Sequence, residues 1–334
     1  MSNKLTVGDR VVESRVWLAP MTGVSDLPFR RAAARLGAAY VATEMVACVE
    51  LARGRPDVVR RAAVGEGLPL MVVQLVGRDP AMMAAGAKMA AAAGAEIIDL
   101  NFGCPAKEVT GVQSGSALMR DLDLATSLVA AAVDAVDVPV TVKMRLGWDD
   151  ASRNAPEFAA RAEAVGARAI TVHGRTRSQF YKGVADWSAI ADVKREISVP
   201  LIVNGDIVDL ASAHVALEAS RADGIMIGRG AYGRPWIAAQ IDAGLEGRVL
   251  ADPDMETRLA IALGHFRDAL SFYGERLGLK MYRKHLASYI EAAPVPESPE
   301  TRRAARAELC RLETPAEVEA ALTRLWLSER RLAA

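Results

Sequence analysis

The 334-residue sequence lacks several features that define whole classes of protein. It has only three cysteines, Cys48, Cys104 and Cys310, which are widely separated and form no Cys-x-x-Cys pair. This spacing excludes a disulfide framework and a cysteine-ligated metal site, and it is typical of a protein from a reducing compartment. We therefore expect a cytoplasmic protein that holds no metal. Nothing in the sequence indicates an obligate protein partner.

Neither an excess of one charge nor a long apolar run is present. Lys+Arg and Asp+Glu each total 41, so the chain has no global basic field of the kind that marks many nucleic-acid-binding proteins. Any RNA site must therefore come from local clusters of basic residues. No apolar run approaches the roughly 18 residues of a membrane span, and the N-terminus lacks the apolar core of a signal peptide. We expect no association with a membrane.

What is present is a repeated unit: a short apolar run, a polar or glycine-rich break, and an Ala-rich amphipathic segment. A short hairpin over residues 4–17, turning at Gly8-Asp9, precedes the first unit. Continuous apolar strands that alternate with helices indicate a parallel sheet covered on both faces. Eight units over about 240 residues favour a closed (β/α)8 TIM barrel over an open doubly wound sheet. The apolar runs are Val16–Ala19, Tyr40–Thr43, Leu70–Leu75, Ile97–Leu100, Pro139–Met144, Ala169–Val172, Leu201–Val203 and Gly224–Ile227.

The pattern changes after Gly244. Residues 252–334 show helical periodicity, with a proline-rich break at 293–299 and no further strand pattern. We therefore predict an α/β barrel domain over residues 1–244, followed by a small all-α domain of three or four helices over residues 252–334.

Polar residues recur at the carboxyl end of almost every predicted strand. Barrel proteins place their functional residues at this end, and a purely structural barrel has no need of polar residues there. These positions are Pro20-Met21, Glu44, Gln74, Asn101, Lys143, His173, Asn204-Gly205-Asp206 and Gly228-Arg229-Gly230.

Cys104 lies just past a buried strand, beside the amide of Asn101. An unperturbed thiol has a pKa of about 8.5 and is mostly protonated at neutral pH, so it can act as a general acid. The alternative is a small buried residue that only packs. We interpret Cys48 and Cys310 in that way.

Lys143 is the one charged residue of its apolar run, and a buried unpaired charge is costly. It therefore points either into a polar cavity or out past the strand end. In a cavity, its charge could stabilise the negative charge of a reduced flavin. The roles of His173 and Gln74 also have two interpretations, because each side chain could contact a cofactor or be hydrogen-bonded within the core.

Residues 228–233 match the pattern Gly-x-Gly-x-x-Gly after a strand. A Rossmann dinucleotide site would have this pattern in the first unit of the fold, whereas here it is in the eighth. The segment fits a phosphate cradle better, with Arg229 adding charge and residues 204–206 forming its neighbour. The alternative is that these glycines only make tight turns.

Two basic groups lie in the predicted helical domain. Residues 280–285 combine Lys280, Arg283, Lys284 and His285 with a tyrosine, and a second group follows at residues 302–306. Each group is either a solvated helix face or a contact surface for an RNA backbone.

Seven motifs follow one another along the chain: Ala19–Arg30, Asn101–Pro105, Val142–Trp148, Thr171–Thr176, Asn204–Ile207, Met226–Gly230 and Arg283–His285. Together they resemble the bacterial tRNA-dihydrouridine synthase family, most closely its B-type group. The sequence departs from the family at Phe102, where many members have methionine, and in the loop over residues 110–116.

The resemblance implies a barrel that binds FMN and a helical domain that binds tRNA. Particular uridines of tRNA would be reduced to 5,6-dihydrouridine, with NADPH as reductant, hydride from flavin N5 to uracil C6, and a proton from Cys104 to C5. The cofactor-binding residues would be Pro20, Met21, Thr22, Gln74, Lys143, His173, Asn204, Gly205, Asp206, Gly228 and Arg229. The substrate-binding residues would be Asn101, Arg175, Lys280, Arg283, Lys284 and His285.

Two other functions stay open. One is an FMN barrel that reduces a free pyrimidine or a small enone, which needs no basic helical domain. The other is an RNA-binding protein that retains a flavin without using it, which needs no thiol at position 104.

Overall fold

The computed structural model describes residues 3–63, 65 and 67–327. Eight parallel strands form one sheet in the order β3-β10-β9-β8-β7-β6-β5-β4. A parallel bridge between Leu18 and Val41 joins the two ends of this order and closes the barrel, which confirms the predicted fold. The strands are β3 (Val16–Leu18), β4 (Ala42–Ala47), β5 (Val72–Val76), β6 (Ile97–Phe102), β7 (Val140–Arg145), β8 (Ile170–His173), β9 (Leu201–Asn204) and β10 (Gly224–Ile227).

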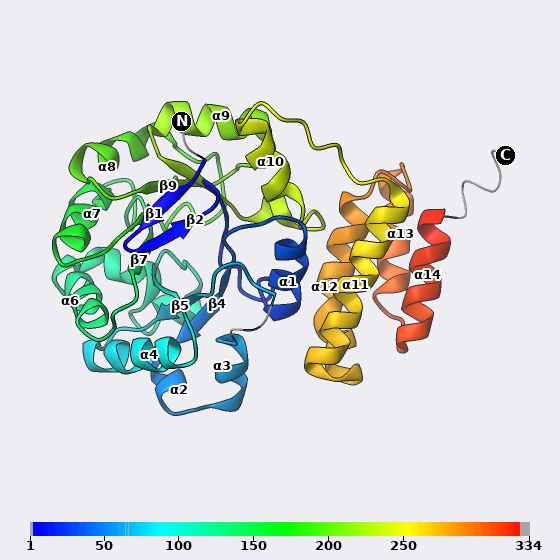
Figure 1. Ribbon diagram of the computed structural model, residues 1–334, viewed down its shortest axis with the longest axis horizontal. Coiled ribbons are helices and arrows are strands. Elements are labelled where there is room, and N and C mark those ends of the chain that lie inside the picture. Colours follow the sequence, from blue (N-terminus) through cyan, green and yellow to red (C-terminus); the bar gives the residue numbers. More distant parts are fainter. Residues whose placement is uncertain (1–2, 64, 66, 328–334) are drawn as a thin grey trace.

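Helices follow the strands and surround the barrel (Figure 1). A two-stranded hairpin, β1 (Leu5–Val7) and β2 (Arg10–Val12), precedes β3 as predicted. The helices around the barrel are α1 (Leu27–Arg35), α2 (Cys48–Ala52), α3 (Pro56–Arg61), α4 (Pro80–Ala92), α5 (Lys107–Thr110), α6 (Leu122–Val133), α7 (Ala155–Ala164), α8 (Ala191–Glu196), α9 (Leu210–Ser220) and α10 (Ile237–Leu245).

Local sequence signals explain where these elements begin and end. Every residue of β5, β6, β9 and β10 is buried, as expected for strands of a parallel sheet covered by helices. Asp79 caps α4 by accepting a hydrogen bond of 2.9 Å from the backbone N–H of Met82, and Pro80 begins the helix. Gly94 follows α4 with a φ of 98°, a conformation that glycine adopts without strain.

The second strand differs from its prediction. The apolar run predicted a strand that ends at Thr43, but β4 begins at Ala42 and its register with β5 shifts between Ala42 and Met45. Glu44 therefore lies within the strand and is buried, not at the strand's end as predicted. A bulge of this kind depends on the partner strand and leaves no clear signal in the sequence.

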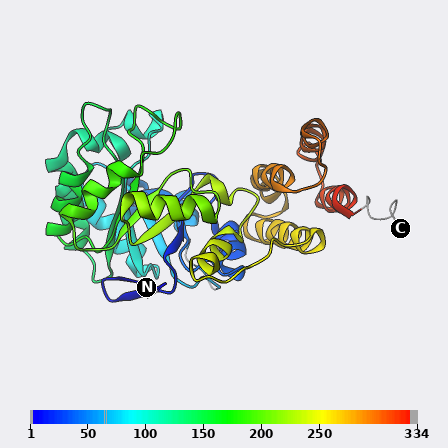
Figure 2. The same cartoon turned by 90° about the horizontal axis from the view of Figure 1, so that it is seen from above.

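Four helices follow the barrel and form the helical unit: α11 (Met255–Tyr273), α12 (Glu275–Ala292), α13 (Pro299–Leu309) and α14 (Pro315–Leu327). They enclose a hydrophobic core of their own, with Phe266, Leu286 and Leu322 fully buried. Figure 2 shows this unit beside the barrel. The last seven residues of the predicted helical domain lie outside the described residues. Within the described chain, no helix is both long and apolar enough to span a membrane.

The helical unit contacts the barrel through α1. Helix α11 packs against α1, and Arg35 forms an ion pair with Asp268 at 2.6 Å. The hydroxyl of Tyr273, at the end of α11, donates a hydrogen bond of 3.0 Å to Asp26, the N-cap of α1. The start of α1 is therefore shared between the barrel mouth and the helical unit.

Candidate active site

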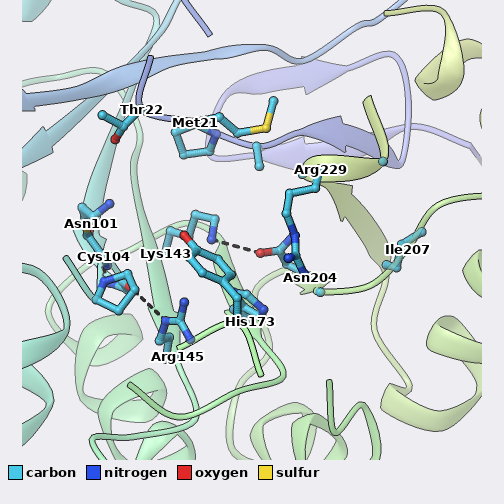
Figure 3. A pocket seen from close by; sticks show the side chains of 18 of the residues that line it. Met21, Thr22, Asn101, Cys104, Lys143, Arg145, His173, Asn204, Ile207 and Arg229 are labelled. Carbon is cyan, nitrogen blue, oxygen red and sulfur yellow. Dashed lines mark hydrogen bonds between the residues drawn. The ribbon is translucent and has the colours of Figure 1, made fainter. Parts of the chain in front are cut away.

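A cavity of about 580 Å³ opens at the carboxyl ends of the barrel strands. Every residue predicted to bind the cofactor lines this cavity, and so do Asn101 and Cys104. Figure 3 shows Asn101 and Cys104 on one side and Asn204 and Arg229 on the other, with Lys143 between them. Residues from distant units meet here because the carboxyl ends of parallel strands share one end of the barrel.

Cationic side chains dominate the floor of the cavity. Lys143 donates a hydrogen bond of 3.1 Å to Asn204, and burial lowers its pKa to about 8. Arg145, two residues along the same strand, donates to the carbonyl of Gly103 at 2.8 Å, and burial lowers its pKa to about 10. His173 has a pKa well below its ordinary value, chiefly because of burial and then because of the neighbouring cations, so its ring is neutral. The floor is therefore suited to an anion.

A chain of hydrogen bonds fixes the Cys104 side of the cavity. Asp99 lies beneath the cavity and accepts bonds from Thr141 Oγ1 at 2.7 Å and Gln74 Nε2 at 2.6 Å. Gln74 Oε1 accepts a bond of 2.8 Å from Asn101 Nδ2. Asn101 Oδ1 then accepts bonds from the backbone N–H groups of Gly103 at 3.1 Å and Cys104 at 2.9 Å.

The direction of every bond in this chain follows from Asp99. A carboxylate only accepts, so Gln74 must present its NH2 to Asp99 and its oxygen to Asn101. Asn101 must in turn present its oxygen to the loop that carries Cys104. Burial raises the pKa of Asp99 to about 6, while the bonds from Thr141 and Gln74 and the charge of Lys143 act to lower it.

Cys104 is half-buried at the edge of the cavity. Burial raises the pKa of its thiol, an effect that the nearby Arg145 and Lys143 oppose. The thiol is therefore protonated at neutral pH and can donate a proton to a bound molecule. Cys48, by contrast, is fully buried and packs inside the barrel wall, as predicted.

The far side of the cavity combines two glycine-containing turns. Gly205 has a φ of 116°, and a Cβ there would lie 2.8 Å from the ring of His173. Gly228 faces open space, since a Cβ there would meet nothing closer than 4.0 Å. Arg229 stands beside this space, 3.3 Å from Asp206 and with its guanidinium 5.0 Å from the ring centre of Tyr181.

Two predictions about substrate contacts need correction. Arg175 is buried, and its guanidinium is taken up by Asp206 at 2.6 Å and by the carbonyls of Lys182 and Gly183. It lies behind the cavity wall and holds Asp206, which in turn pairs with Arg229. His285 is also buried, stacked on Phe29 with ring centres 5.7 Å apart, so its side chain does not reach the surface.

The other basic residues of α12 lie at the surface or near the cavity. Lys280 is exposed, and Arg283 and Lys284 are partly exposed. The ammonium of Lys284 lies next to Gly23, because a Cβ at Gly23 would be 3.0 Å from it. Gly23 follows Thr22, which lines the cavity, so α12 reaches the rim of the barrel mouth.

Sequence reasoning missed several residues that shape the cavity. Arg145 lies two residues after Lys143 on the same strand, and side chains two residues apart point to the same face of a sheet. This alternation could have identified Arg145 as a residue of the cavity. Tyr181 and Tyr232 also line the cavity, but they come from loops with no periodic pattern. Asp99 lies two residues before Asn101 on the same face of its strand, so the same alternation was a signal for it as well.

The fold and this site define a (β/α)8-barrel protein with a cationic pocket at its mouth. The family model described as dihydrouridine synthase (Dus) matches residues 17–325. The chain belongs to this family, and the resemblance stated from its motifs is confirmed.

Relatives agree with this assignment, and a solved structure shares the fold alone. A protein of Rhodobacter capsulatus named probable tRNA-dihydrouridine synthase is 52% identical over 323 residues, which are 95% of this chain and 96% of the relative. A Pseudomonas putida protein named tRNA-dihydrouridine synthase B is 43% identical over 290 residues, or 86% of each chain. Morphinone reductase in complex with tetrahydroNAD shares the fold, with a TM-score of 0.55 at 16% identity over 77% of this chain and 93% of the other.

Proposed function

We propose that this protein reduces uridine to 5,6-dihydrouridine in tRNA, with FMN bound across the barrel mouth and NADPH as reductant, in the cytoplasm. Membership of the family supports the proposal. The observation that carries it is a cavity that joins a protonated thiol, Cys104, to the half-buried cation Lys143 and the buried cation Arg145.

The residues of the cavity fit FMN. A reduced flavin ring and a phosphate are both anionic, and the cavity offers cations at two places, Lys143 with Arg145 and separately Arg229. The open space at Gly228 leaves room for a phosphate beside Arg229. Pro20, Met21, Thr22 and Gln74 would line the ring, Lys143 and His173 would contact the ring or ribityl chain, and Asn204, Gly205, Asp206, Gly228 and Arg229 would hold the ribityl chain and phosphate.

When bound, FMN supplies the hydride that uracil C6 receives. The residues of this chain supply the proton, hold the uracil and stabilise the developing charge. Cys104 donates its proton to C5, and its thiolate then regains a proton from solvent. Asn101 has one N–H of its amide committed to Gln74, so the other is the group that would hold a uracil carbonyl. Negative charge that develops on the uracil as hydride adds is stabilised by the cations of the floor.

A uridine within a stacked RNA cannot reach this cavity, so the target base must be flipped out into the barrel mouth. Lys280, Arg283 and Lys284 lie along α12, and Lys284 reaches the rim of the mouth. We assign to these residues the contacts with the tRNA backbone. Such contacts would make the affinity fall with rising salt.

The direct test uses the full-length protein with FMN and NADPH. One sample receives tRNA that lacks dihydrouridine and another receives free uridine, and nucleosides are then analysed by mass spectrometry. We expect dihydrouridine in the tRNA sample and little in the other. Comparable reduction of free uridine would favour the small-molecule alternative, and a protein that does not take up FMN would refute the proposal.

A further inference from the structure

Three ionisable side chains meet at the junction of the barrel and the helical unit. Asp26 begins α1, His265 lies on α11 and His285 lies on α12, and Figure 1 shows these three helices side by side. One carboxylate oxygen and one ring nitrogen of each histidine lie within 4.8 Å of one another. All three side chains are nine-tenths or more buried, with exposed fractions of 6%, 1% and 5%.

Both histidines leave a ring nitrogen without a partner. His265 pairs through Nδ1 with the hydroxyl of Tyr289 at 3.1 Å, while its Nε2 is buried and has no hydrogen bond. The Nε2 of His285 is buried and unpartnered in the same way. A buried polar atom without a partner destabilises the folded state, because it has lost its hydrogen bonds to water. Two such atoms in a cluster with one carboxylate indicate that something polar binds within the cluster.

We propose that Asp26, His265 and His285 bind one divalent transition-metal ion, with zinc the best match to these donors. Two imidazoles and one carboxylate are a common zinc ligand set. Bonds of about 2.0–2.1 Å in a tetrahedral site place ligand atoms about 3.3 Å apart, so the separations between ligand atoms need to shorten by no more than about 1.5 Å. Because the site is closed to substrate, its role is structural and does not depend on the proposed reaction.

The contacts behind these side chains are those that support metal ligands. The bond between His265 Nδ1 and Tyr289 orients that ring, and Asp26 is held by Tyr273 at 3.0 Å and by the N–H of Phe29 at 3.0 Å. Outer hydrogen bonds of this kind fix the direction of ligating atoms. His265 and Asp26 can therefore face an ion without new partners for their other atoms.

The charge state of the cluster also suits a cation. Burial lowers the pKa of His265 to about 3 and that of His285 to well below its ordinary value, so both rings are neutral, as a metal ligand must be. Burial raises the pKa of Asp26 to about 6, so its carboxyl is mostly ionised at neutral pH with or without a bound cation. The ammonium of Lys284 and the guanidinium groups of Arg30 and Arg35 oppose the ion, and the carboxylate of Glu44 favours it.

A metal here would tie the barrel to the helical unit. Asp26 belongs to the barrel, whereas both histidines belong to the antiparallel-packed pair α11 and α12. The ion would fix α12, and with it Lys280 and Arg283, relative to the barrel mouth. We therefore expect the ion to stabilise the junction more than either part alone.

The test begins with the full-length protein prepared without a histidine tag. Its metal content is measured by mass spectrometry after dialysis, and cobalt is then substituted so that visible absorption reports the coordination. Two variants remove a ligand: His265→Gln, and Asp26→Asn, which keeps the N-cap of α1. His214→Gln is the matched control, because His214 is exposed on α9.

We expect about one zinc per chain in the wild type and in His214→Gln, and less than about a fifth of that in either ligand variant. The cobalt protein should show the absorption of four- or five-coordinate cobalt, and chelation should lower the melting temperature. A wild type that neither holds zinc nor takes up cobalt would overturn the proposal and leave a buried water as the bridging group. Metal bound equally by wild type and ligand variants would also overturn it, as an adventitious ion only.

Discussion

The barrel mouth and the junction with the helical unit both bury ionisable side chains, but they satisfy them differently. At the mouth, the buried carboxylate of Asp99 has two hydrogen-bond donors, and Lys143 and Arg145 each have acceptors. At the junction, His265 and His285 each keep a buried nitrogen without a partner. The mouth is therefore a complete network that presents its groups to a bound molecule. The junction is incomplete as a network of protein atoms alone.

This difference predicts that mutations at the mouth and at the junction will have different effects. A complete network loses function when one member is removed, because each member orients the next. Removal of one side chain from an incomplete cluster should instead abolish the binding of the group that completes it. The following variants test the mouth, from the largest expected effect to the smallest, and end at the exposed face of α12.

Cys104→Ala should have the largest effect. Removal of a general acid costs about 10²–10⁴ in rate, so dihydrouridine formation should fall by this factor. FMN absorption should persist, since the cations that we assign to FMN are unchanged. Single-turnover assays on tRNA measure the rate. Cys310→Ala, in the helical unit, is the control, and turnover by Cys104→Ala at the wild-type rate would refute the acid role.

Asp99→Leu should cost about tenfold in kcat. The variant removes the oxygen that accepts from Gln74 and the one that accepts from Thr141, so the amides of Gln74 and Asn101 lose their fixed direction. A lost hydrogen bond of about 1–1.5 kcal/mol corresponds to a factor of about ten. FMN binding and melting temperature should change less.

The matched control is Asp99→Asn, whose oxygen can accept from Gln74 while its amide donates to Thr141. We expect it to keep activity within about twofold. Equal losses in the Leu and Asn variants would show that the charge of Asp99, and not the direction of the chain, is what matters.

Binding of FMN to the protein stripped of cofactor should weaken as pH rises through about 8. The pKa of Lys143 is lowered by burial to about 8, so its ammonium is present below this pH and lost above it. We expect about a fivefold to tenfold loss of affinity between pH 7 and 9, measured by quenching of flavin fluorescence. Lys143→Arg keeps its charge over this range and should flatten the profile. A pH-dependent loss that persists in Lys143→Arg would assign it to another group.

Lys280→Ala should have the smallest effect. Lys280 lies on the exposed face of α12, whereas His285 lies on its buried face. Loss of one phosphate contact should weaken tRNA binding by about twofold to fivefold and reduce the slope of log K against log salt by about one. The rate at saturating tRNA should not change. Lys88→Ala, on the exposed face of α4, is the control, and an equal effect of both variants would indicate non-specific attraction.

Most of the fold followed from local patterns. The eight apolar runs predicted the eight strands because a buried parallel strand is apolar along its whole length. The exception was β4, whose bulge depends on its pairing with β5. The helical unit was predicted by periodicity, and its four helices agree with the expected number.

The site was predicted in part. Residues at strand ends meet in one cavity because the barrel brings those ends together, as Asn101, Lys143 and Asn204 show. Arg175 and His285 were assigned to the substrate because their charge or motif suggested it, but both point inward. For His285 a signal was present, since Tyr282, Leu286 and Tyr289 form the buried stripe of the same helix.

The sequence alone determined the barrel, the helical unit and the strand-end cavity, because the periods of strands and helices and the parallel direction of the strands fix them. Only the tertiary structure decided which loop residues contribute side chains to the cavity, as Tyr181 does. It likewise decided which side chains are buried behind the cavity wall, as Arg175 is. It also decided the meeting of Asp26 with His265, 239 residues apart in the chain. No local pattern encodes such a contact, because it arises only when α1 packs against α11.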